Sequence, residues 1–387
     1  MALWVSSFAQ GSMDDVLKEI EQNNATLRAL RMEMEATKAA NHTGLALDDP
    51  EMEIAYLWGS PSTIGSRKDF RISQSIDMAT LTGAKRRLAR QQDKVAEWQY
   101  LQEHRQVMLE ARWLCIDIVY YNAMIQELGL RYANAEAIAE TEKKRMECGE
   151  ATRMDYNAAC LDLAQVKGDM VSLEAERDAA MALLQGMNGG NTVELYTTCY
   201  PMTERVADFD VWYAAAEKVC PALATLKEKV LVAERQVDLN RTEGLPRLTA
   251  GFMGEYLTGE KFQGISVGLS IPLWSNRGKI RQAKAEAEAA KARREDAEKK
   301  IYATLRSLFV RQNAIRAAAD TLTLAMKTTD NTMLLKKALD AGTISVTDYL
   351  LGARMYYEAK DKEMETWRQW HRSWAELMAF GGQNDTK

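Results

Sequence analysis

Apolar residues alternate with polar ones in short stretches of the chain and recur at helical spacing almost everywhere else. Alternation with a period of two is typical of a strand with one apolar face, whereas spacings of three and four are typical of an amphipathic helix. Turn-forming residues interrupt each alternating region at 59–65 and 258–261. The pattern therefore predicts one β-hairpin over 50–77 and another over 246–273.

Long helices are expected on both sides of each hairpin. The stretches after the hairpins contain no proline, which would break a helix interior, and they run as far as Gly149 and Gly342. At 1.5 Å per residue, a helix of about 70 residues spans about 105 Å, far more than an ordinary globular helix. The expected helical ranges are 12–47, 78–147 and 152–186, and then 206–243, 279–341 and 345–380.

The order of these elements occurs twice, which indicates a duplication. Matching residues lie 193 to 196 positions apart and include Pro50 and Pro246, Gly83 and Gly278, and Asp155-Tyr156 and Asp348-Tyr349. The first repeat is expected to cover 1–190, and the second 206–382, with a linking segment at 191–205. Each repeat holds a helix, a β-hairpin and a long helical hairpin, the last at 78–186 and 278–380.

Two isolated hairpins are not stable alone, so the strands need partners from outside the chain. Strands of eight to ten alternating residues have the length that crosses a bilayer when tilted. Backbone groups in lipid must all be paired, which requires closure between subunits. The expected fold is mainly α with β: duplicated long-helix hairpins forming a trimeric helical tunnel, and two β-hairpins per chain in a shared 12-stranded transmembrane β-barrel.

Charge and composition exclude several classes of function. The formal net charge of −5 argues against a nucleic-acid partner, which would require a basic excess. No uncharged run reaches 18 residues, which argues against a membrane-spanning helix. The five cysteines and three histidines lack the spacing of a metal site, and the 20 methionines are best explained as core residues. With neither a phosphate-binding loop nor a catalytic constellation, we expect no enzyme, no metal and no cofactor.

The first ten residues, MALWVSSFAQ, have an apolar stretch followed by a small-residue cleavage pattern at Ala9-Gln10. A complete signal peptide also needs a basic segment in front, which is missing. This pattern favours a truncated signal peptide over a simple apolar N-terminus.

Three motifs occur in order along the second repeat. These are Gly268-Leu269-Ser270-Ile271-Pro272-Leu273, Gly278-Lys279-Ile280-Arg281-x-Ala283 and Gly342-Thr343-Ile344-Ser345-Val346-Thr347-Asp348. Together with the duplication, they resemble the TolC-like outer-membrane efflux protein family over nearly the whole chain. The first repeat departs from the pattern, because Asp77-Met78 replaces Pro272-Leu273. The resemblance implies a homotrimer in the bacterial outer membrane with its helical part in the periplasm. It also implies outer-membrane lipid, a periplasmic adaptor and an inner-membrane pump as partners, and a passive conduit as function.

The resemblance also places functional residues. It puts the turns at Gly149, Gly342 and Thr343 at the periplasmic tip, where an adaptor docks. An aspartate at the position of Asp348 lines the closed aperture in the family, and Asp155 is its counterpart in the first repeat. Some relatives carry a second aspartate where this chain has Leu351, which would form an apolar constriction instead. The alternative to an aperture role is a structural one, in which each aspartate closes a capping box at a helix start. The two boxes are Thr152-x-x-Asp155 and Ser345-x-x-Asp348.

Aromatic residues gather around the two hairpins. Their clustering favours the interpretation that they form an aromatic girdle at the membrane interface, because Tyr and Trp combine an apolar body with a polar end. The alternative is that they are ordinary strand formers. The residues are Tyr56, Trp58, Phe70, Phe252, Tyr256, Phe262 and Trp274.

Two other classes of protein remain open at this point. Long helices rich in Ala, Glu, Lys and Arg would also suit a soluble coiled-coil scaffold. A periplasmic adaptor-type structural protein also carries a helical hairpin. Neither class explains two hairpins with an apolar face of bilayer length.

Overall fold

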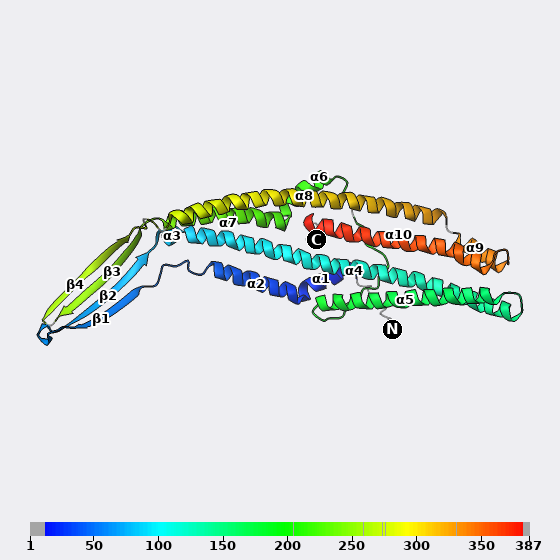
Figure 1. Cartoon of the computed structure of the whole chain (residues 1–387), viewed down its shortest axis with the longest axis horizontal. Coiled ribbons are helices and arrows are strands. Elements are labelled where there is room, and N and C mark those ends of the chain that lie inside the picture. The colour runs from blue at the N-terminus through cyan, green and yellow to red at the C-terminus, as the bar shows by residue number, and fades with distance from the viewer. Residues whose placement is uncertain are drawn as a thin grey trace, which may run out of the picture. The chain divides into compact units, whose positions relative to one another are not determined.

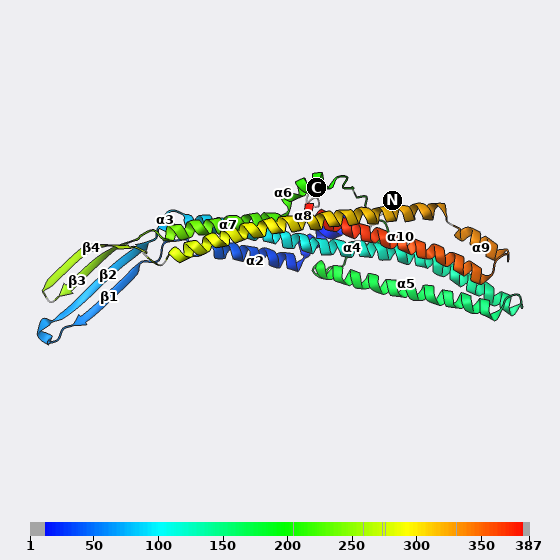
Figure 2. The same cartoon turned by 45° about the horizontal axis from the view of Figure 1, so that its top comes forward.

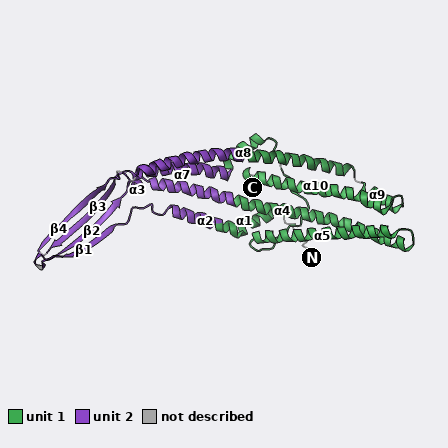
Figure 3. Ribbon diagram, in the orientation of Figure 1, with its two compact units in different colours: residues 1–29, 104–219, 302–387 green, residues 30–103, 220–301 purple. Residues whose placement is uncertain are grey.

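The computed structural model describes residues 12–203, 205–257, 259–272, 274, 276–329 and 331–381. The expected signal segment at residues 1–10 lies outside this part. The chain forms two compact units, shown in different colours in Figure 3. The helical unit comprises Met1–Ala29, His104–Val219 and Tyr302–Lys387, and the hairpin unit comprises Leu30–Glu103 and Cys220–Ile301. Each unit takes segments from both sequence repeats, so the compact units do not follow the repeat boundary at 191–205.

The hairpin unit contains both expected hairpins. They combine into one antiparallel sheet with the strand order β1-β2-β3-β4 (Figure 1). The central pairing joins β2 to β3, where Ile72 faces Phe252. The strands are β1 (Glu51–Trp58), β2 (Ser66–Ile76), β3 (Arg247–Leu257) and β4 (Glu260–Ser270), and the short 3₁₀-helix η1 (Ser62–Ile64) lies between the first two.

Several helices adjoin this sheet in the hairpin unit, and the one that follows β2 begins with a defined cap. The short helix α3 (Met78–Leu81) follows β2 directly, and Asp77 Oδ1 accepts a 2.6 Å hydrogen bond from the Thr80 amide at its start. The other helices that contribute to the unit are α2 (Ala25–Asn41), α4 (Ala84–Glu147), α7 (Pro221–Glu243) and α8 (Arg277–Thr328). Their buried contacts use small side chains, among them Ala79 and Ala84 against Leu239, and Ala283 and Ala287 against Val237. Small residues at these positions let the helix backbones approach closely.

The helical unit contains two helical hairpins. In Figures 1 and 2, α4 lies beside α5 (Arg153–Met187), and α9 (Thr332–Asp340) folds back onto α10 (Val346–Gly381). Two shorter helices, α1 (Met13–Asn23) and α6 (Phe209–Val219), complete the unit. No described helix has an apolar stretch long enough to cross a membrane.

The core of the helical unit lies where α1, α4, α5 and α10 meet. Its fully buried members include Ile20, Ile118 and Leu184. The segment between the repeats takes part, because Leu195 is buried in the same cluster and Asn122 Nδ2 donates to its carbonyl oxygen at 2.9 Å. The expected linker is therefore a structural part of this unit.

The structure corrects the expectation of unbroken helices. The helix expected over 279–341 stops at Thr328 and restarts at Thr332. A run of short polar residues occupies the break, and the Thr329 hydroxyl donates to the Ala325 carbonyl oxygen at 2.7 Å. Such side chains compete with the backbone for hydrogen bonds and weaken a helix even without proline or glycine.

The helices in front of the hairpins are also divided. The range 12–47 breaks at Asn24, whose Oδ1 accepts from the Leu27 amide at 2.9 Å and so starts α2. The range 206–243 breaks before Pro221, which occupies the first position of α7. Both residues are typical of helix starts, and helical spacing on the two sides conceals them in the sequence.

Candidate functional site

Two turns close the helical hairpins of the helical unit. Each contains a glycine in the left-handed region, Gly149 with φ of 77° and Gly342 with φ of 67°. The amide of the following residue returns to the preceding helix at Arg145 O (2.8 Å) in the first turn and at Ala338 O (2.9 Å) in the second. These bonds pair helix-end carbonyls that would otherwise have no partner. A β-carbon at either glycine would meet nothing within 4 Å, so backbone conformation and not packing requires these glycines.

Thr343 belongs to the structure of the second turn. Its hydroxyl donates to Ala338 O at 2.8 Å, and its side chain is otherwise exposed. Thr343 therefore pairs a carbonyl group at the end of α9 and is also accessible from outside the chain.

The two repeated aspartates start the returning helices. Asp155 accepts from the Thr152 amide (3.1 Å) and hydroxyl (2.6 Å), while its own amide donates to Thr152 Oγ1 at 3.2 Å. Asp348 makes the same three bonds with Ser345, at 3.3, 2.7 and 3.1 Å. The capping-box interpretation is therefore confirmed in both repeats. The Thr152 hydroxyl, followed by its backbone amide, lowers the pKa of Asp155 below its ordinary value.

Capping leaves the Asp348 carboxylate at the surface. Both bonds that the carboxylate accepts use Oδ2, and the residue is exposed. Leu351 lies one turn further along α10 and is also exposed, so the two share a face of the helix. An exposed carboxylate can cap a helix and still present its charge, so the two roles are compatible.

A cluster behind the turns holds the two helical hairpins together. Ile138 of α4 and Ala159 of α5 pack in one buried group with Leu339 of α9 and with Val346 and Tyr349 of α10. Burial raises the pKa of Tyr349. The sequence pattern predicted apolar faces here but did not show which faces meet.

Polar contacts reinforce this cluster, and the sequence analysis missed them. Asn134 Nδ2 donates to Tyr349 Oη at 2.7 Å, and Lys336 donates to Asn134 Oδ1 at 3.0 Å. Further along α4, the buried Arg131 donates two bonds to Asp361 of α10, at 2.7 and 3.2 Å. The only sequence signal was the pair of matching tyrosines, Tyr156 and Tyr349. In the sequence, a buried polar residue of a long charged helix cannot be distinguished from one that faces solvent.

The sheet of the hairpin unit has two chemically different faces. Directly opposed residues share a face, so the register places one apolar row across all four strands: Met52, Ile72, Phe252 and Ile265. All four are exposed or half-buried in the single chain. The opposite face is polar, and Arg67 there is within 2.7 Å of both Asp69 and Glu255.

The same register sorts the aromatic residues. Five lie on the apolar face: Tyr56, Trp58, Phe70, Phe252 and Tyr256. Phe262 is opposite Glu255 and therefore lies on the polar face, a separation that the sequence pattern did not reveal. Trp274 lies beyond the end of β4, and its side chain is 86% exposed.

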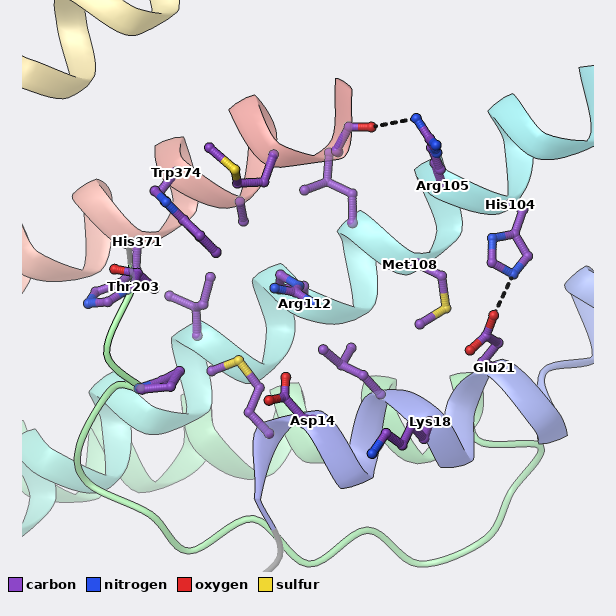
Figure 4. A pocket seen from close by; sticks show the side chains of 18 of the residues that line it. Asp14, Lys18, Glu21, His104, Arg105, Met108, Arg112, Thr203, His371 and Trp374 are labelled. Carbon is purple, nitrogen blue, oxygen red and sulfur yellow. Dashed lines mark hydrogen bonds and ion pairs between the residues drawn. The ribbon is translucent and has the colours of Figure 1, made fainter. Parts of the chain in front are cut away.

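A cavity of about 380 Å³ in the helical unit lies among α1, α4, α10 and the segment around Thr203 (Figure 4). Two contacts join charged groups at its edge: Glu21 is 3.1 Å from His104, and Arg105 donates to the Ala379 carbonyl oxygen at 3.5 Å. His371 stacks on Tyr200 at 4.0 Å between ring centres. Burial, with a smaller effect of Arg316, lowers the pKa of His371 to about 3. The stacking of Tyr200 on His371 thus holds the segment between the repeats against α10 beside the cavity.

This fold is similar to that of solved outer-membrane channels. The fold matches the CmeC outer membrane channel of Campylobacter jejuni with a TM-score of 0.76 and 17% identity, covering 96% of this chain and 85% of that one. It also matches the outer membrane protein VceC of Vibrio cholerae with a TM-score of 0.77 and 12% identity, covering 95% and 96%.

Sequence comparison points to the same class. Residues 212–383 match the family model "Outer membrane efflux protein". The alkaline protease secretion protein AprF of Pseudomonas aeruginosa is 23% identical, over 97% of this chain and 85% of the relative. The second repeat is thus similar to outer membrane efflux proteins, and the similarity to AprF extends over nearly the whole chain. The matched family model and the solved structures with this fold are those of outer-membrane efflux channels, which are passive conduits and not enzymes. The comparisons do not support the scaffold or adaptor alternatives.

The capping bond of Asp155 predicts a pH-dependent stability. Asp155→Asn should lower the free energy of unfolding by about 1 kcal/mol at pH 7, because it removes the charge that strengthens the two bonds accepted from Thr152. Because the folded state lowers the pKa of Asp155, the contribution is present above the unfolded-state value of 3.8 and is lost as the pH falls below it. Thermal unfolding followed by circular dichroism at pH 7 and pH 3 measures the difference.

The matched control is Asp169→Asn, an exposed position inside α5. It should leave the unfolding temperature nearly unchanged at both pH values. Equal effects of the two substitutions at pH 7 would show that the cap does not stabilise the turn.

Proposed function

We propose that the chain is the homotrimeric outer-membrane channel of a tripartite export system. The observation that carries this proposal is the four-stranded sheet, which has an exposed apolar face and two edge strands, β1 and β4. Edge strands carry unpaired backbone groups, and these cannot remain unpaired in lipid. Joining β4 of one copy to β1 of the next pairs them, and three copies supply the twelve strands of a closed barrel.

The helical unit supports the same assembly. Large apolar side chains are exposed on its helices, among them Leu130, Met154, Leu161 and Met333. Covering such side chains removes apolar surface from water and so favours association. In the proposed trimer these side chains are covered by neighbouring copies, and the helices line a tunnel in the periplasm.

The turns at Gly149, Gly342 and Thr343 are proposed as the docking surface for a periplasmic adaptor, which connects the channel to an inner-membrane pump. Their exposure and their helix-closing geometry support this role. The cargo would be selected largely by the pump, because a passive conduit has no energy source of its own.

Asp348 is proposed to line the aperture, with Leu351 as an apolar constriction one turn further and Asp155 as the weaker candidate. Three copies of an exposed carboxylate around an axis attract cations and repel anions. The exposure of Asp348 and Leu351 on one face of α10 supports this arrangement.

Assembly is tested by fractionation. Protein extracted from outer membranes in detergent should migrate as a trimer in mild gel electrophoresis and as a monomer after boiling, because the edge strands are paired between copies. A monomer recovered from the soluble fraction without detergent would contradict the proposal.

Docking is tested at the second turn. Gly342→Val should reduce export several-fold while leaving the amount of trimer in the outer membrane unchanged, because a branched residue strains the left-handed backbone only locally. Gly168→Val, inside α5 where a β-carbon meets nothing within 4 Å, is the control and should keep export. Loss of the trimer in Gly342→Val would instead assign the turn a role in folding.

The aperture is tested by conductance in planar bilayers. Asp348→Ala should raise conductance or reduce cation selectivity, because it removes three charges from the proposed ring. Ser345→Ala is the matched control, because it removes the hydroxyl of the same cap and retains the carboxylate. A cap-only role predicts unchanged conductance in both variants and a loss of about 1 kcal/mol in stability.

A further inference from the structure

Two segments of the hairpin unit are basic without a compensating acid. Between residues 78 and 92, four side chains are cationic and none is acidic, and the same holds between 271 and 285, in a chain whose formal net charge is −5. These are the stretches where the chain leaves β2 and β4 and enters α4 and α8. The cations are Lys85, Arg86, Arg87 and Arg90 in the first segment, and Arg277, Lys279, Arg281 and Lys284 in the second.

The fold brings the two segments to the same end of the sheet. The register aligns Ile76 at the end of β2 with Leu248 near the start of β3, and Leu248 with Leu269 near the end of β4. Both segments therefore begin at one end of the strands, opposite to the turns of the hairpins. Arg247, exposed at the start of β3, adds a further cation there.

Most of these cations are directed to solvent. Lys85 is half-buried and lies 3.1 Å from Asp77, and Arg87 donates to the Thr82 carbonyl oxygen at 2.8 Å. Within the described part of the chain, the other six are exposed and have no carboxylate within 4.0 Å: Arg86, Arg90, Arg277, Lys279, Arg281 and Lys284. Further along α8 the pattern changes, because Lys291, Lys299 and Lys300 each lie within 3.4 Å of an acidic side chain.

Folding does not explain the six exposed cations that have no acidic partner. Cations in the first turns of a helix oppose its dipole, and acidic residues are the favoured choice there. Neither α4 nor α8 has an acidic residue in its first turn. Repulsion among exposed cations adds to this cost, so an anionic partner outside the chain is the simplest physical reason for them.

Apolar side chains lie directly between the strands and the cations. Leu81, Ile271 and Trp274 are all more than half exposed. From the strands outward, the order is an apolar sheet face, then an exposed indole and two aliphatic side chains, then guanidinium and ammonium groups. A bilayer presents its hydrocarbon core, its interface and its headgroups in the same order.

We propose that the two basic segments, residues 85–90 and 277–284, bind the headgroups of anionic phospholipids at the membrane surface from which the helices emerge. This rests on the proposed placement of the sheet in the membrane. Arginine suits the phosphodiester, because its planar group donates two parallel hydrogen bonds to phosphate oxygens. The interaction is electrostatic and weakens as salt screens it.

The test uses the purified full-length trimer in detergent micelles that contain either dioleoyl phosphatidylglycerol or dioleoyl phosphatidylcholine. Phospholipid retained after gel filtration is measured by phosphorus assay. The wild-type protein should retain several-fold more of the anionic lipid, and this preference should largely disappear in 0.5 M salt. The variant Arg86→Gln/Arg90→Gln/Lys279→Gln/Arg281→Gln should lose the preference.

A control with the same change in charge is Lys291→Gln/Arg293→Gln/Lys299→Gln/Lys300→Gln, which alters α8 beyond the basic segment. It should retain the preference of the wild-type protein. Equal retention of the two lipids by the wild-type trimer would overturn the inference, as would an equal loss in both variants. Unchanged retention in the first variant, together with altered ion selectivity in planar bilayers, would assign the cations to the channel interior and also overturn it.

The outcome separates this inference from the proposed function. A trimer recovered from outer membranes that shows no lipid preference contradicts only the lipid inference. A soluble monomer contradicts the proposed function first.

Discussion

Pairing of backbone groups at the edges of the sheet is the constraint on which the rest of this structure depends. Within the described part of one chain, β1 and β4 each pair on one side only. A sheet with an apolar face that also has open edges is stable in lipid only when other copies complete it. The proposed assembly, in which β4 of one copy joins β1 of the next, follows from this requirement.

The helical unit meets a different requirement, which is to hold long helices in a defined arrangement with little core. Its buried clusters are small, and specific polar contacts supplement them. Arg131 with Asp361 and Asn134 with Tyr349 each join α4 to α10. Buried polar groups are costly unless they are paired, so such contacts define one alignment of the helices and penalise others.

The helix ends have equivalent local structure in different surroundings. Asp155 and Asp348 close capping boxes that are equivalent in the two repeats, yet Asp348 is exposed while Asp155 is half-buried. The duplicated sequence therefore supplies equivalent local structure, and the surroundings of each copy differ. A channel built from repeats can in this way use one copy of a motif for stability and the other for contact with ions or a partner.

The sequence by itself determined the local structure: the two hairpins, the helical character of the segments around them, the glycine turns and the capping boxes. These depend on residues a few positions apart, whose spacing is visible in the chain. Only the tertiary structure decided that β2 pairs with β3, that Phe262 lies on the polar face, and that each compact unit combines both repeats. It also decided the partners of Arg131 and Asn134, more than 200 residues away. Helical periodicity shows that a face is apolar, but contacts at such a distance depend on which faces meet, and no local pattern encodes that.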